Sequence, residues 1–380
     1  MFNNESTFLI GAKYYNASNT ESQGAGSRGI NPDFNLVETN DYISSDFELP
    51  NENIALFGET ILKFSEKFSV TPGFRFEYIK TQSNGEYTRI NRDAAGNPIA
   101  SNTFTDNRIN DRNLLLLGIG TSYKPNTSVE LYGNISQNYR SVTFSDIRTV
   151  NPSFLVDENI SDERGQTIDV GVRGKWSKYV NYDFSAFGLF YNDRIGVILE
   201  NEGPDKGDRL RTNIGDALIL GIESLVEWNV LSTFDIENSN YKLTVFNNLS
   251  LITSEYTSTI SRFGVEGNDV EFVPNVNLKN GLKFGYKNLL ANVQFSYLSE
   301  QFSDASNAVE PDESGTRGKI PAYSILDVSL SYTFKSLKLE TGINNLLDET
   351  YFTRRATGYP GPGIIPSAPR NWYVTLQVKI

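Results

Sequence analysis

Apolar and polar side chains alternate through long stretches of this chain, and this period of two constrains the fold more than any other feature. In the segment KFSVTPGFRFEYIK, the side chains of Phe74 and Phe76 fall on one face, whereas Arg75 and Glu77 fall on the other. Alternation over more than about ten residues indicates a long β-strand with one apolar and one polar face. Because strands of soluble proteins are typically about 5–6 residues long, the pattern favours a β-barrel that spans a membrane.

The same alternation recurs in about fourteen segments, and no stretch has the pattern of an amphipathic helix. The expected strands are residues 6–15, 53–64, 67–80, 114–123, 127–136, 166–176, 182–191, 214–228, 241–252, 275–286, 289–299, 324–334, 337–344 and 372–380. The last of them continues to the final residue, as a strand that forms part of a barrel wall can.

The connections between these segments alternate between short and long. Short connections are expected near residues 66, 125, 178, 288 and 336, with a slightly longer one at 230–236. Long loops are expected at 16–50, 83–110, 141–164, 200–212, 257–267, 302–319 and 350–368. Aromatic residues such as Trp176, Trp228 and Tyr332 lie near the short turns, where an interfacial aromatic belt would be. Together these features predict an all-β, transmembrane antiparallel β-barrel.

Composition excludes several other classes of protein. Hydrophobic residues make up 38% of the chain, and no run reaches the about 18 apolar residues that a spanning helix needs. Without Cys or His, the chain has no thiol nucleophile, no Cys/His zinc site and no histidine general base. A net charge of −12 gives no overall basic field for nucleic acid. We therefore expect no enzyme activity, no cofactor and no nucleic-acid partner.

Several segments go beyond a generic barrel pattern. The stretches NIGDALILGIESLVEW, YGNISQNYRSVTFSDI and INNLLDETYFTRRATGYPGPGIIPSAPRNWY resemble parts of TonB-dependent outer-membrane receptors, and the YFTRRATGYPGPG loop is most similar to that of ferric citrate receptors. The resemblance runs from about residue 50 to residue 380. It implies a location in the cell outer membrane, contact with outer-membrane lipid, uptake of a ferric chelate, and coupling to TonB through an N-terminal plug domain.

The same resemblance implies a particular domain organisation. Receptors of this kind have a plug and a 22-stranded barrel, so residues 1–380 are expected to be the C-terminal portion of the barrel domain, with the plug and the signal peptide outside this chain. Ile380 departs from the aromatic residue on which the family usually ends. Two alternatives remain open: a complete fourteen-stranded passive channel, which would conduct without energy, and a soluble carbohydrate-binding β-protein.

Basic residues are the candidate ligand-binding groups. In a receptor of this kind, arginines could bind an anionic metal chelate, because a guanidinium offers paired donors to carboxylates. Alternatively, charges inside the barrel pair with one another across neighbouring strands. Arg354 and Arg355 are expected to hold the last loop in place rather than to contact the ligand. The candidates are Arg140 at the start of the loop at 141–164, Arg148 within that loop, Arg173 at an inward-facing position of a strand, and Lys206, Arg209 and Arg211 on the loop at 200–212. We expect the acidic stretch NDYISSDFELPNEN to be a solvated loop rather than a Ca²⁺ site.

Overall fold

The computed structural model describes all residues except 1–5, 25–42, 94, 96, 148–153, 200–208, 235, 237–239, 261–263, 314, 357–362 and 380. Its main feature is a 15-stranded sheet in which all strands but one follow a single antiparallel path, each paired with its neighbours in chain order. The strands of this path are β1 (Thr7–Gly24), β2 (Ile43–Lys63), β3 (Phe68–Arg92), β4 (Pro98–Asn126), β5 (Val129–Arg140), β7 (Glu163–Trp176), β8 (Val180–Leu199), β9 (Arg209–Asn229), β10 (Tyr241–Tyr256), β11 (Val276–Tyr286), β12 (Leu289–Leu298), β13 (Tyr323–Phe334), β14 (Leu337–Asn344) and β17 (Asn371–Val378).

The remaining elements are short. Strand β6 (Phe154–Val156) pairs in parallel with β9, and β15 (Phe352–Ala356) pairs with β16 (Gly363–Pro366) in a separate hairpin. The helices α1 (Phe144–Ile147) and α2 (Val230–Thr233) are single turns. Among the described residues, neither helix has the length and apolar content that a membrane crossing requires.

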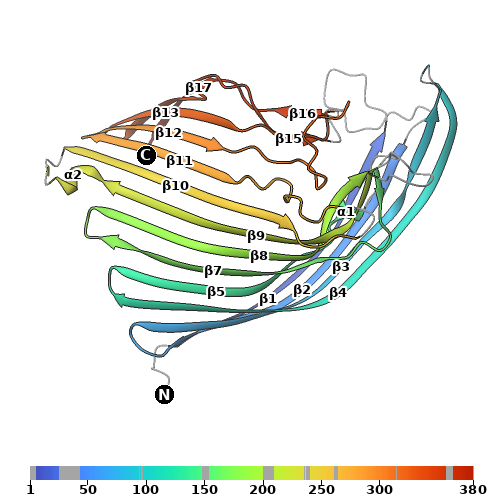
Figure 1. Ribbon diagram of the computed structural model, residues 1–380, viewed down its shortest axis with the longest axis horizontal. Helices are drawn as coiled ribbons and strands as arrows, with labels where there is room; N and C mark the ends of the chain where they lie inside the picture. Colours follow the sequence, from blue (N-terminus) through green and yellow to red (C-terminus); the bar gives the residue numbers. More distant parts are fainter. Residues whose placement is uncertain are drawn as a thin grey trace.

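The sheet curves into a wall with tight turns along one end, which we call the turn end, and the long connections along the other, which we call the loop end (Figure 1). The order of strands runs from β1 to β17, and these two strands are not paired with each other. Strand β17 pairs with β14, so the expected strand at residues 372–380 is part of the wall. The antiparallel wall of about fourteen strands is thus confirmed, as an open curved sheet.

The two faces of the sheet differ as the alternation predicted. The outer face carries apolar side chains that are 42–48% exposed, among them Phe74, Phe76, Leu330 and Tyr332. The inner face carries Arg75 and Glu77, which form an ion pair. Aromatic rings gather at the turn end, where the ring centroids of Phe64 and Phe68 lie 5.8 Å apart and those of Tyr241 and Tyr286 lie 4.6 Å apart. An apolar outer face with aromatic rings at its border is what a barrel wall in lipid requires.

Several boundaries of the predicted loops are wrong. Strands β3 and β4 pair from Phe68–Tyr123 to Arg92–Pro98, so most of the expected loop at 83–110 is a hairpin that extends the wall. Polar residues on both faces hid this strand pattern, and cross-strand contacts stabilise it, such as the 3.1 Å hydrogen bond between the hydroxyls of Thr88 and Thr103. The acidic stretch at residues 40–53 is also mostly strand rather than loop, because β2 begins at Ile43.

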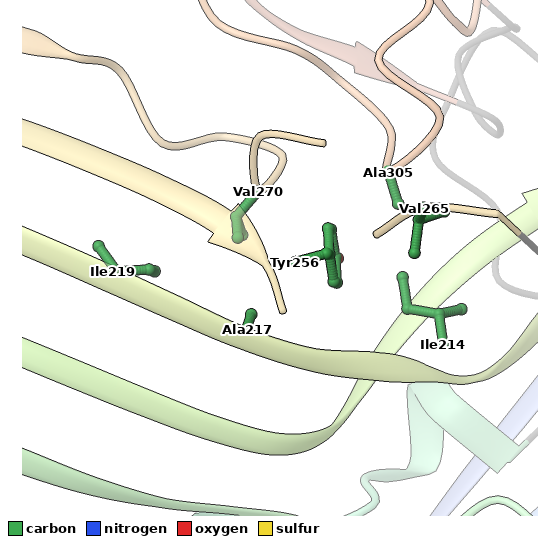
Figure 2. Packing of buried hydrophobic residues seen from close by; sticks show 7 residues of the cluster. All are labelled: Ile214, Ala217, Ile219, Tyr256, Val265, Val270 and Ala305. Carbon is green, nitrogen blue, oxygen red and sulfur yellow. The ribbon is translucent and has the colours of Figure 1, made fainter. Parts of the chain in front are cut away.

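Apolar side chains are buried mainly at the loop end. One cluster comprises Ile214, Ala217, Ile219, Tyr256, Val265, Val270 and Ala305. Figure 2 shows these side chains converging from β9, from the end of β10 and from the two connections that follow β10 and β12. A second cluster comprises Val142, Ile147, Val156, Ile160 and Ile195. These two cores fix the long connections against the wall and therefore position the groups at the loop end.

Candidate ligand-binding site

Ion pairs at the loop end join the long connections to the strands of the wall. On β8, the Arg194 guanidinium lies 3.2 Å from the carboxylate of Glu271, in the connection between β10 and β11. On β9, the Arg209 guanidinium lies 3.4 Å from the carboxylate of Asp312, in the connection between β12 and β13, and also contacts Thr316. Each of these pairs joins residues at least 77 positions apart in the sequence. The pairs therefore stabilise one conformation of the loops.

The described parts of the connection between β5 and β7, residues 141–147 and 154–162, contact β4 and β9 on the inner side of the wall. Arg108 on β4 donates to the backbone oxygen of Asp157 at 3.2 Å, and Arg112 on β4 lies 2.8 Å from the carboxylate of Asp162. At the other side, the Thr212 hydroxyl on β9 donates to the Asp157 carboxylate at 2.6 Å. Since it is attached to both strands, this connection forms a surface over the inner face of the loop end.

Arg140, the last residue of β5, lies at the root of this connection. Its guanidinium is 2.9 Å from the Asp146 carboxylate and 3.4 Å from the Glu163 carboxylate, while 43% of its side chain remains exposed. Burial alone would raise the pKa of Asp146, but hydrogen bonds from the Thr143 backbone and hydroxyl, together with Arg140, hold that pKa below its ordinary value. Arg140 thus combines two carboxylate partners with an accessible guanidinium face.

Arg209 and Arg211 do not lie on a loop as predicted, because β9 begins at Arg209. Only 18% of the Arg209 side chain is exposed, and burial lowers its pKa. Arg211 is partly buried two residues further along β9, and its backbone oxygen accepts a hydrogen bond from the Asp157 amide at 2.9 Å. The pairing of β9 with both β8 and β6 explains the error, since it draws these residues into the sheet.

The other candidates are not brought together with these. Arg173 faces inward as predicted, but it lies three residues before Trp176, at the turn end, where its guanidinium is 3.0 Å from the Glu130 carboxylate. Arg148 and Lys206 lie outside the described residues. The structure therefore places Arg140, Arg209 and Arg211 at the loop end and Arg173 at the opposite end of the wall.

Arg355 has the packing role that the sequence suggested. Its guanidinium donates to the backbone oxygens of Gly315 at 2.8 Å and of Lys319 at 2.9 Å, which holds the hairpin of β15 and β16 against the connection between β12 and β13. Arg354 is exposed. Residues 357–362 of the YFTRRATGYPGPG loop lie outside the described residues.

The sequence did not single out Arg112, Arg194 or Tyr256. The Tyr256 side chain is 1% exposed, and its hydroxyl donates to Glu271 at 2.7 Å and accepts from Arg194 at 3.2 Å. A positive φ of 56° at Asp193 marks an irregularity in β8 that changes the side-chain phase just before Arg194. No local signal reveals this arrangement, because its partners come from three separate strands and loops.

The described residues contain no group of three or more carboxylates that could hold a metal ion. The loop-end inner face is therefore a surface of paired arginines and carboxylates that could bind a polar ligand through hydrogen bonds, with Arg140 the most accessible of its described candidate cations.

Comparisons with known proteins agree with this architecture. The family model described as TonB dependent receptor-like, beta-barrel, matches residues 2–346. The vitamin B12 transporter BtuB of Vibrio vulnificus is 24% identical over 280 residues, which are 72% of this chain and 38% of that protein.

Solved structures give the same fold. The unliganded ferric citrate transporter FecA matches with a TM-score of 0.73 and 20% identity, over 100% of this chain and 52% of that one. The ferric yersiniabactin receptor FyuA of Yersinia pestis matches with a TM-score of 0.71 and 16% identity, over 98% and 51%. The copper transporter OprC matches with a TM-score of 0.69 and 13% identity, over 98% and 54%. The chain thus spans about half the length of these solved structures.

Proposed function

The chain belongs to the TonB-dependent receptor-like β-barrel family, and from that premise we propose that it forms part of an outer-membrane receptor for an anionic metal chelate, with ferric citrate as the preferred type. The family consists of transport receptors of the outer membrane, which act on a transported ligand together with TonB. For this chain, the ligand, the membrane and the partner are our proposal. We also propose that residues 1–380 are the C-terminal part of a larger barrel, for which the unpaired ends at β1 and β17 are the support.

The observation that carries the ligand proposal is the position of Arg140. It lies on the inner face at the loop end, beside the connection that runs across to Arg211 on β9, and 43% of its side chain is exposed. A chelate that enters from the loop side would meet this guanidinium before any group at the turn end. The acidic chain, at −12, needs such local cations to offset its general repulsion of an anion.

Ferric citrate fits this surface because its free carboxylates can accept the paired donors of a guanidinium. A charge-assisted contact of this kind stabilises a complex by about 1.5–3 kcal/mol. Two such contacts, from Arg140 and Arg211, would together strengthen binding by at least about a hundredfold. The similarity of the YFTRRATGYPGPG loop to that of ferric citrate receptors supports the same ligand class.

A neutral ligand of the vitamin B12 type is the second candidate. The match to a vitamin B12 transporter favours it, and so does the pairing of Arg140 and Arg209 with carboxylates, which already neutralises much of their charge. A ligand without charge would then bind through the hydroxyl and amide groups of the same surface.

Binding titrations of the purified receptor separate the two candidates. We expect ferric citrate to bind, and the double variant Arg140→Ala with Arg211→Ala to bind it at least about a hundredfold more weakly. Arg140→Lys keeps a cation beside Asp146 but removes the planar donor pair, so it should weaken binding while leaving the connection at 141–162 folded.

Arg370→Ala is the matched control, because Arg370 forms an exposed ion pair with Asp348 at 3.4 Å, close to the last strand. It should leave the affinity unchanged. An unchanged affinity in the double variant would exclude Arg140 and Arg211 as the site. Binding of vitamin B12 together with no binding of ferric citrate would establish the second candidate instead.

A further inference from the structure

One arginine on the outer face stands apart from those at the loop end. Arg164 is the second residue of β7, its side chain is exposed, and among the described residues it contacts no carboxylate. By contrast, a carboxylate partner is present for each of four arginines that face the inside or the loops: Arg112, Arg140, Arg194 and Arg209. A cation held on the wall without an internal partner is available to a ligand from outside.

The register of the sheet places Arg164 at the loop-end border of the band of apolar side chains on the outer face. Counted from the turn end, the outer face of β7 presents Trp176, Gly174, Val172, Val170 and Ile168, and then changes to Gln166 and Arg164. The apolar part therefore covers residues 168–176, a length that matches the about 9–11 residues of a strand that crosses a bilayer. Gln166 and Arg164 follow directly above it, at the level of lipid headgroups.

The neighbouring strands change from apolar to polar within two rows of this level. Arg164 lies opposite Tyr139 on β5 and Asn192 on β8. One position below, Gln166 lies opposite Gln137 and Phe190, and below that row Ile168 lies opposite Ile135 and Gly188. The isoleucines are 37% and 43% exposed. Strand β8 changes one row nearer the loop end, from Phe190 to Asn192, and β4 changes from Leu115 to Asn113.

A cavity of about 290 Å³ lies at this boundary. It forms where β5 diverges from β4, since the pairing of these two strands stops at Gly118–Ser136. The Tyr139 hydroxyl reaches through the gap to the Glu77 carboxylate, and Gln137 accepts a hydrogen bond from the Leu117 amide at 3.0 Å. The polar side chains that line the cavity are Asn113, Gln137, Asn138, Tyr139, Arg164, Gln166 and Asn192.

The chemistry of this cavity suits a phosphate group. It offers one guanidinium and several amide donors, and no carboxylate lines it. The next outward side chain on β4 is Asp111, which accepts a hydrogen bond from the Tyr78 hydroxyl at 3.4 Å. Guanidinium and amide N–H groups are the donors that proteins use for phosphate oxygens. The apolar side chains directly below would contact acyl chains, so a lipid satisfies both parts of the site.

We propose that this cavity binds the phosphate of an anionic lipid headgroup in the outer leaflet of the membrane, with Arg164 as its principal contact. The inference rests on the proposed placement of the chain in the outer membrane, with the loop end facing outward. It is independent of the chelate, because Arg164 faces away from the interior of the wall. The bound lipid would also cover the gap between β4 and β5 on its membrane side.

Native mass spectrometry of the intact receptor in dodecyl maltoside tests the proposal, with dioleoyl phosphatidic acid and dioleoyl phosphatidylcholine as the two probes. We expect the protein to prefer the phosphatidic acid by about tenfold, which corresponds to about 1.4 kcal/mol. Arg164→Ala should abolish this preference, and Arg164→Lys should keep part of it. The control Arg354→Ala removes an exposed arginine of the β15 hairpin and should change nothing.

Heat-dependent migration in gel electrophoresis verifies that each variant is folded. Equal preference in the wild type and in Arg164→Ala would overturn the proposal, as would competition by inorganic phosphate at millimolar concentration, which would assign the cavity to a free anion. Chelate binding measured on the same samples separates this inference from the proposed function. If chelate binding is intact and the lipid preference is absent, only the lipid site is wrong. If the lipid preference is present and no chelate binds, only the ligand proposal is wrong.

Discussion

The contact between Arg194, Tyr256 and Glu271 should control how firmly the connection between β10 and β11 is held. In the variant Arg194→Ala, the Glu271 carboxylate loses its cation while only 11% of its side chain is exposed. The Tyr256 hydroxyl still donates to that carboxylate at 2.7 Å. It no longer accepts the hydrogen bond that Arg194 donates to it at 3.2 Å. In the variant Tyr256→Phe, Arg194 and Glu271 still contact each other.

The structure sets the order of these effects. Breaking a buried ion pair from one side costs about 3–5 kcal/mol, and the remaining tyrosine contact puts Arg194→Ala at the lower end, about 3 kcal/mol. Tyr256→Phe removes hydrogen bonds to charged groups, which costs about 1.5–3 kcal/mol. Arg370→Ala breaks an ion pair whose side chains are 52% and 49% exposed, and such pairs contribute about 0–1 kcal/mol.

Hydrogen exchange reports this loss locally. The Gly267 amide donates to the Tyr256 backbone oxygen at 2.8 Å, and the Val270 amide donates to the Ser254 hydroxyl at 3.2 Å. A loss of about 3 kcal/mol should speed exchange of both amides by at least about a hundredfold in Arg194→Ala. Tyr256→Phe should give a smaller increase and Arg370→Ala none. Unchanged exchange in Arg194→Ala would show that the apolar cluster alone holds this connection.

Two further predictions concern the wall and the pH dependence of the loop end. Val293→Arg places a charge on the outer face in the middle of β12 and should destabilise the protein in lipid vesicles by about 2–4 kcal/mol, measured by urea titration, whereas the adjacent inward substitution Gln294→Arg should cost far less; equal costs would contradict the assignment of faces. Because the pKa of Asp146 is lowered in the folded protein, its contribution to stability is present above its unfolded pKa of about 3.9 and is lost as the pH falls through the lowered value. Exchange in the connection at 141–162 should therefore rise only below about pH 4, and Asp146→Asn should remove that part of the acid dependence. Burial raises the pKa of Glu163, so protonation of Glu163 favours the folded state as the pH falls, and this opposite dependence remains in the Asp146→Asn variant. An acid transition that is unchanged by Asp146→Asn would refute the role of the Asp146 carboxylate.

The wall of this protein could be predicted from sequence because its two sides face different surroundings. Phe74 and Phe76 alternate with Arg75 and Glu77, and the structure keeps all four on the expected faces. A shift of one residue would exchange every side chain between the faces. The alternation therefore predicted the strands and their two faces, while the aromatic residues near the short turns predicted the belt at the turn end.

The extended hairpin escaped prediction for the opposite physical reason. Above the apolar band, both faces of β3 and β4 are polar, so residues such as Thr88 and Thr103 give no contrast between the faces. The side of β2 that buries Phe47 and Leu49 was hidden in the same way within an acidic stretch. Residues that favour turns indicated loops in these segments, whereas pairing with neighbouring strands makes the segments part of the sheet.

The candidate site could be predicted only in part. Arg140 follows from its position at the end of a strand, but its partner Asp146 depends on the helical turn of α1. The pairing of Arg209 with Asp312 joins residues 103 positions apart. Such contacts depend on how two long connections fold against each other, which no periodicity in the sequence encodes.

Uptake of radiolabelled iron from ferric citrate tests the central proposal most directly. Cells that produce the intact receptor would be compared in hosts with and without TonB, beside cells that produce the Arg140→Ala and Arg211→Ala double variant. The account predicts accumulation only in the host with TonB, and its loss in the double variant. Equal entry of iron in the two hosts would contradict it, because the protein would then act as a passive channel.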